Sequence, residues 1–237
     1  MGTRSFINDI DTSHISLGCD GIDIPIVFSV RNLGVIMDSK LTFEDHVKHV
    51  TNKVNTSLYK LYNLRHITNT NMCKTLVNAL IQPHINYCSA VIYGLGSVLD
   101  GKFQRLANKG IRFVPGLPWD AHITQARKDL NWLTVRKTRA RSMLNITWAA
   151  IHEHTPSYLA ELISVYTAAR VLRNQSAAIT LTVPNHRTSS YKAAFAVTAP
   201  YLWNSLPDDV KLAPDFSTFK SNLFTWVFNS DDDDLVT

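Results

Sequence analysis

Four basic residues recur at helical spacing near the middle of the chain. Lys102, Arg105, Lys109 and Arg112 follow one another in steps of three, four and three residues. In an α-helix they therefore lie on one face, at about one cation per turn. The other face is mostly apolar, with Phe103, Leu106, Ala107, Gly110 and Val114. Because like charges at this spacing repel one another weakly, the pattern favours contact with an anion such as nucleic acid. The alternative is an ordinary solvated face.

A second basic cluster, Arg136, Lys137, Arg139 and Arg141, opens a predicted helix, where the helix dipole disfavours cations. Residues 102–141 contain ten basic and two acidic residues, a net charge of +8, whereas the whole chain carries +5. Such a concentration indicates a polyanionic partner. Phosphate contacts position a duplex without reading its sequence, so we expect salt-sensitive, sequence-tolerant binding. The alternative for the second cluster is a group of exposed side chains whose stems lie along apolar surface.

Other residues of catalytic type do not form a site in the sequence. Asp208 and Asp209 form an adjacent carboxylate pair of the kind that two-metal phosphoryl transfer can use. They follow a proline at a predicted helix end, however, where Asp is a common turn or capping residue. Cys73, His84 and Cys88 lack the spacing of a zinc site, so we interpret the cysteines as buried helix thiols. We therefore expect no catalytic residue, metal or cofactor in this chain, and no enzymatic activity of the chain by itself.

The hydrophobic pattern predicts a mainly α protein, with a small N-terminal β-hairpin or sheet remnant followed by a helical bundle and further helices. A hairpin is expected at 15–24 and a third short strand at 27–35. One apolar stripe runs along a predicted helix at 43–64, with Thr42 and Asp45 as a capping pair. A second helix is expected from 70, with a kink at Pro83 and a continuation toward 92, and a third at 98–114.

The second half of the sequence is also mostly helical in pattern. Helices are expected at 121–130, 135–154, 157–165, 193–206 and 216–228, with a strand-like run at 179–183. We divide the chain into a β element at 1–38, a helical bundle at 39–118, a C-terminal helical region at 119–230 and an acidic tail at 231–237. The sequence contains no apolar run long enough to span a membrane. Three cysteines fit a reducing compartment, so we expect an intracellular protein of the nucleus, the cytoplasm or both.

Several phrases, in this order and spacing, resemble the C-terminal part of the reverse transcriptase of jockey-type non-LTR retrotransposons (LINE elements). The resemblance covers about residues 15–228. The phrases are Leu33-Gly34-Val35-Ile36-Met37-Asp38 with Leu41-Thr42-Phe43 and His46; Pro83-His84-Ile85-Asn86-Tyr87-Cys88; Leu130-Asn131-Trp132-Leu133; Pro156-Ser157-Tyr158-Leu159; and Phe195, Pro200, Leu202, Trp203-Asn204-Ser205-Leu206-Pro207, Phe219 and Lys220.

This resemblance implies that the N-terminal strands are the end of a polymerase palm, and that residues 39–118 form a thumb-like bundle that grips a primer–template duplex. The family's catalytic aspartates, and the Mg²⁺ they bind, belong to a palm motif that matches no residue here. The resemblance therefore implies binding of a DNA or RNA duplex without a catalytic centre.

The alternative is a co-opted helical scaffold for protein–protein interaction, without enzymatic activity. Its motivation is the apolar stripe at 43–64, which a missing palm would leave partly uncovered. Its partner would be the rest of such a polymerase or another protein, and no membrane is expected. Polymerase activity of this chain ranks third.

Overall fold

The structure, a computed structural model, describes residues 17–24, 26–167 and 178–231. It is mainly helical, with short β-hairpins before the first long helix, as the sequence predicts. The chain divides into two compact units. Unit 1 comprises Met1–Ile85 and Leu95–Leu117, and unit 2 comprises Asn86–Gly94 and Pro118–Thr237.

Unit 1 begins with the predicted hairpin. Strands β1 (Leu17–Cys19) and β2 (Ile22–Ile24) pair antiparallel, and the start of the expected strand at 15–16 lies outside the described residues. The turn consists of Asp20 and Gly21, both with positive φ. Two such residues give a turn whose twist matches the flanking strands, and Asp-Gly is a favoured pair for it.

The third strand expected at 27–35 is present but shorter, and a fourth strand that the sequence analysis does not predict pairs with it to form a second hairpin. Strands β3 (Ser29–Asn32) and β4 (Val35–Asp38) pair antiparallel in a separate two-stranded sheet. Leu33 and Gly34 have φ of 45° and 89° and reverse the chain between them. The sequence signal was weak because Leu rarely adopts this conformation, and Leu33 is 85% exposed.

An aspartate organises the loop before helix α2 (Glu44–Leu64), and Thr42 of the predicted capping pair accepts a hydrogen bond from the Glu44 N–H at 3.5 Å. Phe43 occupies the N-cap position and its side chain cannot accept a hydrogen bond. The Asp38 carboxylate instead accepts hydrogen bonds from the backbone N–H groups of Lys40, Thr42 and Phe43 and from the Thr42 hydroxyl. Partial burial alone would raise the pKa of Asp38, but these hydrogen bonds outweigh it and hold that pKa below its usual value.

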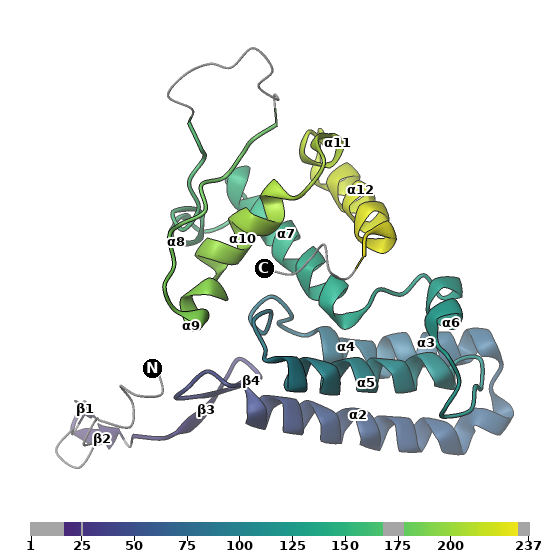
Figure 1. Cartoon of the computed structure of the whole chain (residues 1–237). Helices are drawn as coiled ribbons and strands as arrows, with labels where there is room; N and C mark the ends of the chain where they lie inside the picture. Colours follow the sequence, from purple (N-terminus) through teal and green to yellow (C-terminus); the bar gives the residue numbers. More distant parts are fainter. Residues whose placement is uncertain (1–16, 25, 168–177, 232–237) are drawn as a thin grey trace. The chain divides into compact units, whose positions relative to one another are not determined.

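The remaining elements of unit 1 run back and forth along α2 (Figure 1). They are the 3₁₀ turn η2 (Arg65–Ile67), α3 (Thr70–Leu80), α4 (Gln82–Asn86) and α5 (Ser97–Phe113). The break near Pro83 and the third helix agree with the sequence prediction. The helical continuation toward 92 is wrong, because residues 87–94 form turns. Gly116 adopts a φ of 75° just after the end of α5, and its N–H donates a hydrogen bond to the Arg112 carbonyl. A glycine in this conformation is a common helix terminator.

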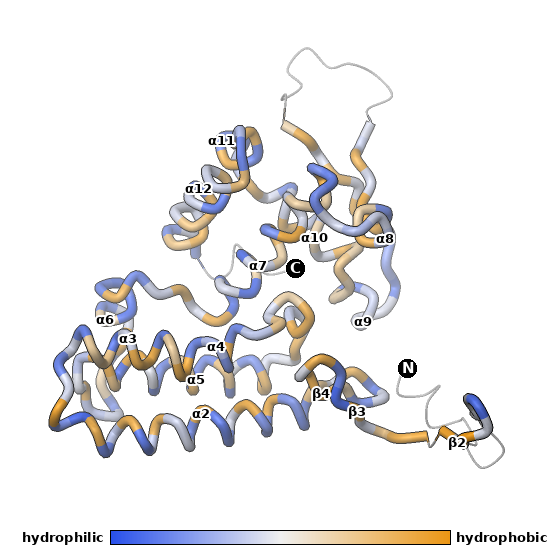
Figure 2. Tube along the Cα trace, turned by 180° about the vertical axis from the view of Figure 1, so that it is seen from behind, coloured by the Kyte–Doolittle hydropathy of each residue, from blue (hydrophilic) through white to orange (hydrophobic). Residues whose placement is uncertain are grey.

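The apolar stripe of α2 is buried in this bundle. Hydrophilic and hydrophobic residues alternate along α2 and α5 (Figure 2). Val54 is fully buried, and so are its stripe neighbours Val47, Val50, Leu58 and Leu61. On the other side of the bundle Gly110 of α5 lets α3 approach closely, since a Cβ at this position would lie 3.2 Å from Val77 Cγ1.

Unit 2 is built around α7 (Val135–Ile151), which packs against α10 (Phe195–Asn204) and α12 (Phe216–Asn229). Shorter helices complete it: α6 (Thr124–Asp129), α8 (Ser157–Ala160), α9 (Ser189–Lys192) and α11 (Asp208–Lys211). All five predicted helices of this half are present. The helix expected at 157–165 is shorter than predicted, because α8 ends at Ala160. The strand-like run at 179–183 forms a single antiparallel bridge, between Val165 and Leu181.

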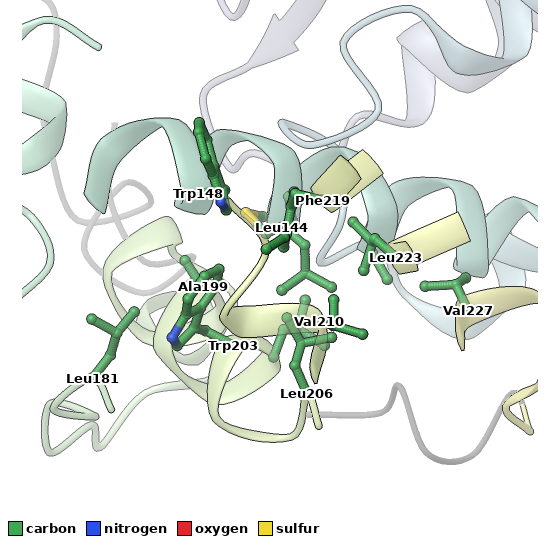
Figure 3. Packing of buried hydrophobic residues seen from close by; sticks show 14 residues of the cluster. Leu144, Trp148, Leu181, Ala199, Trp203, Leu206, Val210, Phe219, Leu223 and Val227 are labelled. Carbon is green, nitrogen blue, oxygen red and sulfur yellow. The ribbon is translucent and has the colours of Figure 1, made fainter. Parts of the chain in front are cut away.

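The core of unit 2 collects large side chains from four helices (Figure 3). Trp148 and Leu144 come from α7, Trp203 from α10, and Phe219 from α12, with Val210 of α11 beside them. Trp203 is 1% exposed, and its ring centroid lies 5.9 Å from that of Phe219. Burial of several aromatic rings of this size contributes most of the driving force for such a core.

Trp203 and Asn204 also tie a loop strand to this core. The Trp203 indole N–H donates to the Ile179 carbonyl at 2.8 Å. The Asn204 amide pairs with the backbone of Leu181 twice, accepting from its N–H at 2.9 Å and donating to its carbonyl at 2.8 Å. The two side chains therefore supply hydrogen-bond partners to backbone N–H and carbonyl groups at residues 179 and 181.

Candidate nucleic-acid interface

The first basic cluster lies on α5 as the sequence predicts. Lys102, Arg105 and Lys109 are exposed, and Arg112 is half-buried near the C-terminal end of the helix. From Lys102 to Arg112 the helix rises about 15 Å. A B-form DNA duplex presents about nine phosphate charges over that axial length. The spacing therefore suits contact with a run of phosphates.

Helix α2 runs beside α5 in the same direction (Figure 1). The Lys109 ammonium donates a hydrogen bond to the Asn55 side-chain oxygen at 2.9 Å. Further along both helices, the Tyr62 ring meets the Phe113 ring edge-on at 5.1 Å between centroids. Because Asn55 is uncharged, it positions the Lys109 ammonium without neutralising it.

A polar stripe of α2 faces the same side as the α5 cations. It consists of Lys48, Asn52, Asn55, Tyr59 and Tyr62, which recur at steps of four and three residues. Tyr59 is 72% exposed and Tyr62 is 52% exposed. The sequence analysis does not predict this stripe, because the apolar stripe is the stronger periodic signal in the same helix. Its signal was present as a second helical repeat of polar and tyrosine residues.

We call the four α5 cations and the five α2 stripe residues the cation–tyrosine face. The acidic residues of both helices are confined to the first turns: Glu44 and Asp45 in α2, and Asp100 in α5. Acids in those positions complement the helix dipole and leave the later turns positive. Lysine and arginine can bind phosphate, and the tyrosine hydroxyls can donate hydrogen bonds to phosphate or sugar oxygens.

A second positive region in unit 1 lies around His49, on a different flank of α2. Burial lowers the pKa of His49, and the nearby charges of Lys53, Arg31 and His84 lower it further. Burial, and then the neighbouring His49, likewise lowers the pKa of His46. The His46 Nδ1 accepts a hydrogen bond from the Ile36 N–H at 3.4 Å, so this imidazole joins β4 to α2.

The second basic cluster does not form a solvated face. Lys137 is 5% exposed and Arg139 is 2% exposed, while Arg136 and Arg141 are half-buried. The Lys137 ammonium donates to the carbonyls of Phe228 and Ser230 at the end of α12. Carbonyls at a helix C-terminus carry partial negative charge, so this contact stabilises the buried ammonium.

The difference in solvent exposure between the two basic clusters follows from the spacing of their residues along the helix. The α7 cations fall at steps of one, two and two residues, which distributes them around the helix. Because α10 and α12 both pack on α7, part of that circumference is interior. The Arg141 guanidinium lies over the Phe224 ring at 5.6 Å, in the range of a cation–π contact. We therefore leave Lys137 and Arg139 out of the candidate interface.

The other candidate residues have local structural surroundings. Asp208 and Asp209 lie in the first turn of α11, with Pro207 at the N-cap. Cys73 is buried in α3, whereas Cys88 is half-buried in the turns after α4 rather than in a helix. Among residues 17–24, 26–167 and 178–231, no three His, Cys, Asp or Glu side chains are grouped so as to hold a metal ion. Within the same residues, every helix is too short or too polar to cross a bilayer.

The chain was compared with protein-family models, with curated proteins and with solved structures, and nothing in the three comparisons matches it.

Proposed function

We propose that the chain binds a nucleic-acid duplex through the cation–tyrosine face, without a catalytic centre of its own. The observation that carries this proposal is the row of exposed cations on α5, at about one per turn. It lies beside the exposed Tyr59 and Tyr62 of α2. The resemblance to the thumb region of a retrotransposon reverse transcriptase supports the same function and names the duplex as a primer–template hybrid.

The physical argument for the proposal is electrostatic. Each phosphate contact releases condensed counterions from the duplex, so several cations on one face give strong but salt-sensitive affinity. Exposed cations in a row repel one another unless an anion meets them. The donors of the face are mainly lysine, arginine and tyrosine groups suited to phosphate oxygens, and phosphate contacts carry no sequence information, so we expect sequence-tolerant binding.

The test is retention of the chain on an immobilised DNA–RNA hybrid at about 100 mM salt, where electrostatic contacts still operate. Replacing Lys102, Arg105 and Lys109 by Glu should abolish retention. The control replaces the exposed Lys40, Lys60 and Lys192 by Glu, which changes the net charge equally. Unchanged retention of the first variant, or equal loss in both, would contradict the proposal. A primer-extension assay with the same hybrid should give no product.

A second candidate function is binding of a protein partner through the β3–β4 hairpin. The apolar stripe of α2 no longer motivates it, because that stripe is buried. The hairpin instead exposes Phe28, Val30 and Leu33. Exposed apolar side chains on a two-stranded sheet favour addition to another sheet. Replacing Phe28 and Leu33 by Ser should leave hybrid retention intact and abolish association with a protein partner.

A further inference from the structure

Basic side chains from three elements of unit 1 converge on one imidazole, that of His49 in α2. They are Arg31 of β3, Lys53 of α2 and His84 of α4. Burial lowers the pKa of His49, and the charges of Lys53, Arg31 and His84 lower it further. Charges act on a neighbouring group in this way at short range. The four side chains therefore form one compact group, which we call the His49 cluster.

The fold brings this cluster together through the hairpin in front of α2. Arg31 lies opposite Ile36 in the β3–β4 register, and the Ile36 N–H donates a hydrogen bond to His46 Nδ1 at 3.4 Å. His49 follows His46 by three residues, about one turn of helix, and Lys53 lies one turn further along. The hairpin, the first half of α2 and α4 lie toward the same end of unit 1 (Figures 1 and 2). Side chains distant in the sequence are thus neighbours at this end.

The centre of the cluster contains a buried polar atom. His49 is half-buried, and its Nε2 atom is buried with no hydrogen-bond partner among the described residues. A buried ring nitrogen without such a partner is unfavourable, and the like charges gathered around it repel one another. An anion in the cluster removes both penalties, because it accepts hydrogen bonds and carries the opposite charge.

The carboxylates of neighbouring elements do not neutralise the cluster. Asp38 of β4 accepts its hydrogen bonds from the loop before α2. Asp45, one turn before His49, is exposed and is not among the charges that shift the pKa of the imidazole. The charges that do act on His49, from β3, α2 and α4, are all positive, and it also interacts with His46. In the described part of the chain, α3 and α5 pack on α2 without adding a charge that acts on His49.

The His49 cluster lies on a different side of α2 from the cation–tyrosine face. At about 100° per residue, His49 and Lys53 lie about a third of a turn around the helix from the stripe of Asn52, Asn55 and Tyr59. A row of phosphates along the cation–tyrosine face therefore does not point at the cluster. A compact group of donors around one imidazole also suits a single tetrahedral anion better than a row of them.

We propose that the His49 cluster binds a single phosphate group, as inorganic phosphate or as a small phosphomonoester. The guanidinium fork of Arg31 suits two phosphate oxygens, and Lys53 supplies a point charge. His49 takes up a proton when the anion binds, so that both of its ring nitrogens are donors and the Nε2–H donates to a phosphate oxygen. The complex then holds more protons than the free protein, so its affinity rises as the pH falls. This site does not depend on the proposed function.

The test is a titration of the full chain with sodium sulfate, followed by NMR spectra of the histidine side chains. Sulfate has the shape and charge of a phosphate dianion but does not titrate near neutral pH, so any pH dependence belongs to the protein. Sodium chloride at equal ionic strength is the reference. We expect saturable shifts of the His49 and His84 signals. The affinity should be about tenfold higher at about pH 5.5 than at about pH 7.5, the factor for a pKa raised by about one unit on binding.

Two variants separate the charges of the cluster from its imidazole. Arg31→Gln combined with Lys53→Gln removes two exposed charges and should abolish the saturable shifts. Because both side chains are exposed, the melting temperature of this double variant should stay close to that of the wild type. His49→Gln should bind sulfate more weakly, as seen at His84, and should lose most of the pH dependence.

The matched control, Lys60→Gln combined with Lys192→Gln, removes two exposed charges elsewhere and should leave sulfate binding unchanged. Wild-type shifts that follow ionic strength alone, or equal loss in the double variant and the control, would overturn the proposal. Displacement of sulfate from His49 by a DNA–RNA hybrid would assign the cluster to the duplex backbone and would also overturn it. The sulfate titration contains no nucleic acid, so its failure is distinguishable from failure of the proposed function.

Discussion

Helices α5 and α7 each carry a cluster of four basic residues, but the two clusters differ in their exposure to solvent. On α5 the four cations share one face, and three of them lie in solvent beside exposed tyrosines. On α7 they are distributed around a helix that packs on two sides, and two of them are buried. The count of charges is therefore a poor guide to function. What separates binding cations from structural ones is their spacing relative to the apolar positions of the same helix.

The largest expected effect is on the stability of the unit 2 core, which packs against α7. Trp203→Ala removes a fully buried ring and the hydrogen bond to the Ile179 carbonyl. The unfolding free energy of unit 2 should fall by about 3–5 kcal/mol. Chemical denaturation followed by tryptophan fluorescence measures the change. A loss below about 1 kcal/mol would show that unit 2 does not depend on this core.

A pair of matched substitutions compares the two clusters directly. Lys137→Met removes a charge-assisted contact to two carbonyls and should lower the unfolding free energy by about 2 kcal/mol. Lys102→Met changes an exposed side chain and should alter stability by less than about 0.5 kcal/mol. Thermal unfolding of both variants decides the point. Equal destabilisation would remove the distinction between a structural and a binding cluster.

A smaller effect is expected at Tyr59, which sequence reasoning overlooked. Tyr59→Ala removes one hydrogen-bond donor from the cation–tyrosine face and should weaken hybrid binding by about 1 kcal/mol, or roughly fivefold. Stability should stay within about 0.5 kcal/mol because the side chain is exposed. Tyr158→Ala, at an exposed tyrosine of unit 2, is the control and should not affect binding in a fluorescence anisotropy titration.

The smallest effect is a pH dependence of unit 1. Burial lowers the pKa of His46 in the folded state, so the unfolded chain binds more protons as the pH falls below about 6.5. The unfolding free energy should therefore decline between pH 7 and the lower folded-state pKa. His46→Gln retains an acceptor for the Ile36 N–H without titrating, and it should flatten the decline. Identical pH profiles of both proteins would assign the dependence to other groups.

Sequence patterns predicted the helices and the α5 face because these depend on local periodicity. Helices α2, α3 and α5 follow clear apolar repeats of about 3.6 residues. The α5 cations alternate with apolar residues, so the same repeat shows which way they point. For α7 the repeat is ambiguous, because the helix is packed on more than one side, and burial of Lys137 depends on α12, about ninety residues later in the chain.

Two of the sequence phrases described above contribute to the fold rather than to chemistry. Gly34, Asp38 and His46 shape and hold the junction between β4 and α2. Trp203 and Asn204 tie the segment at 179–181 to the core of unit 2. Neither role could be predicted from the residues alone, because each depends on a partner brought close only by folding. The second hairpin was missed for a similar reason: Leu33 at a positive φ is an unusual choice.

The most direct test of the central claim is the salt dependence of hybrid binding. The logarithm of the association constant should fall linearly with the logarithm of salt concentration. Replacing Lys102, Arg105 and Lys109 by Gln should reduce the magnitude of that slope by about three, about one for each lost phosphate contact. The control with Lys40, Lys60 and Lys192 replaced by Gln should reduce it by less than about one. Equal slopes for the wild type and the α5 variant would contradict a nucleic-acid interface on α5.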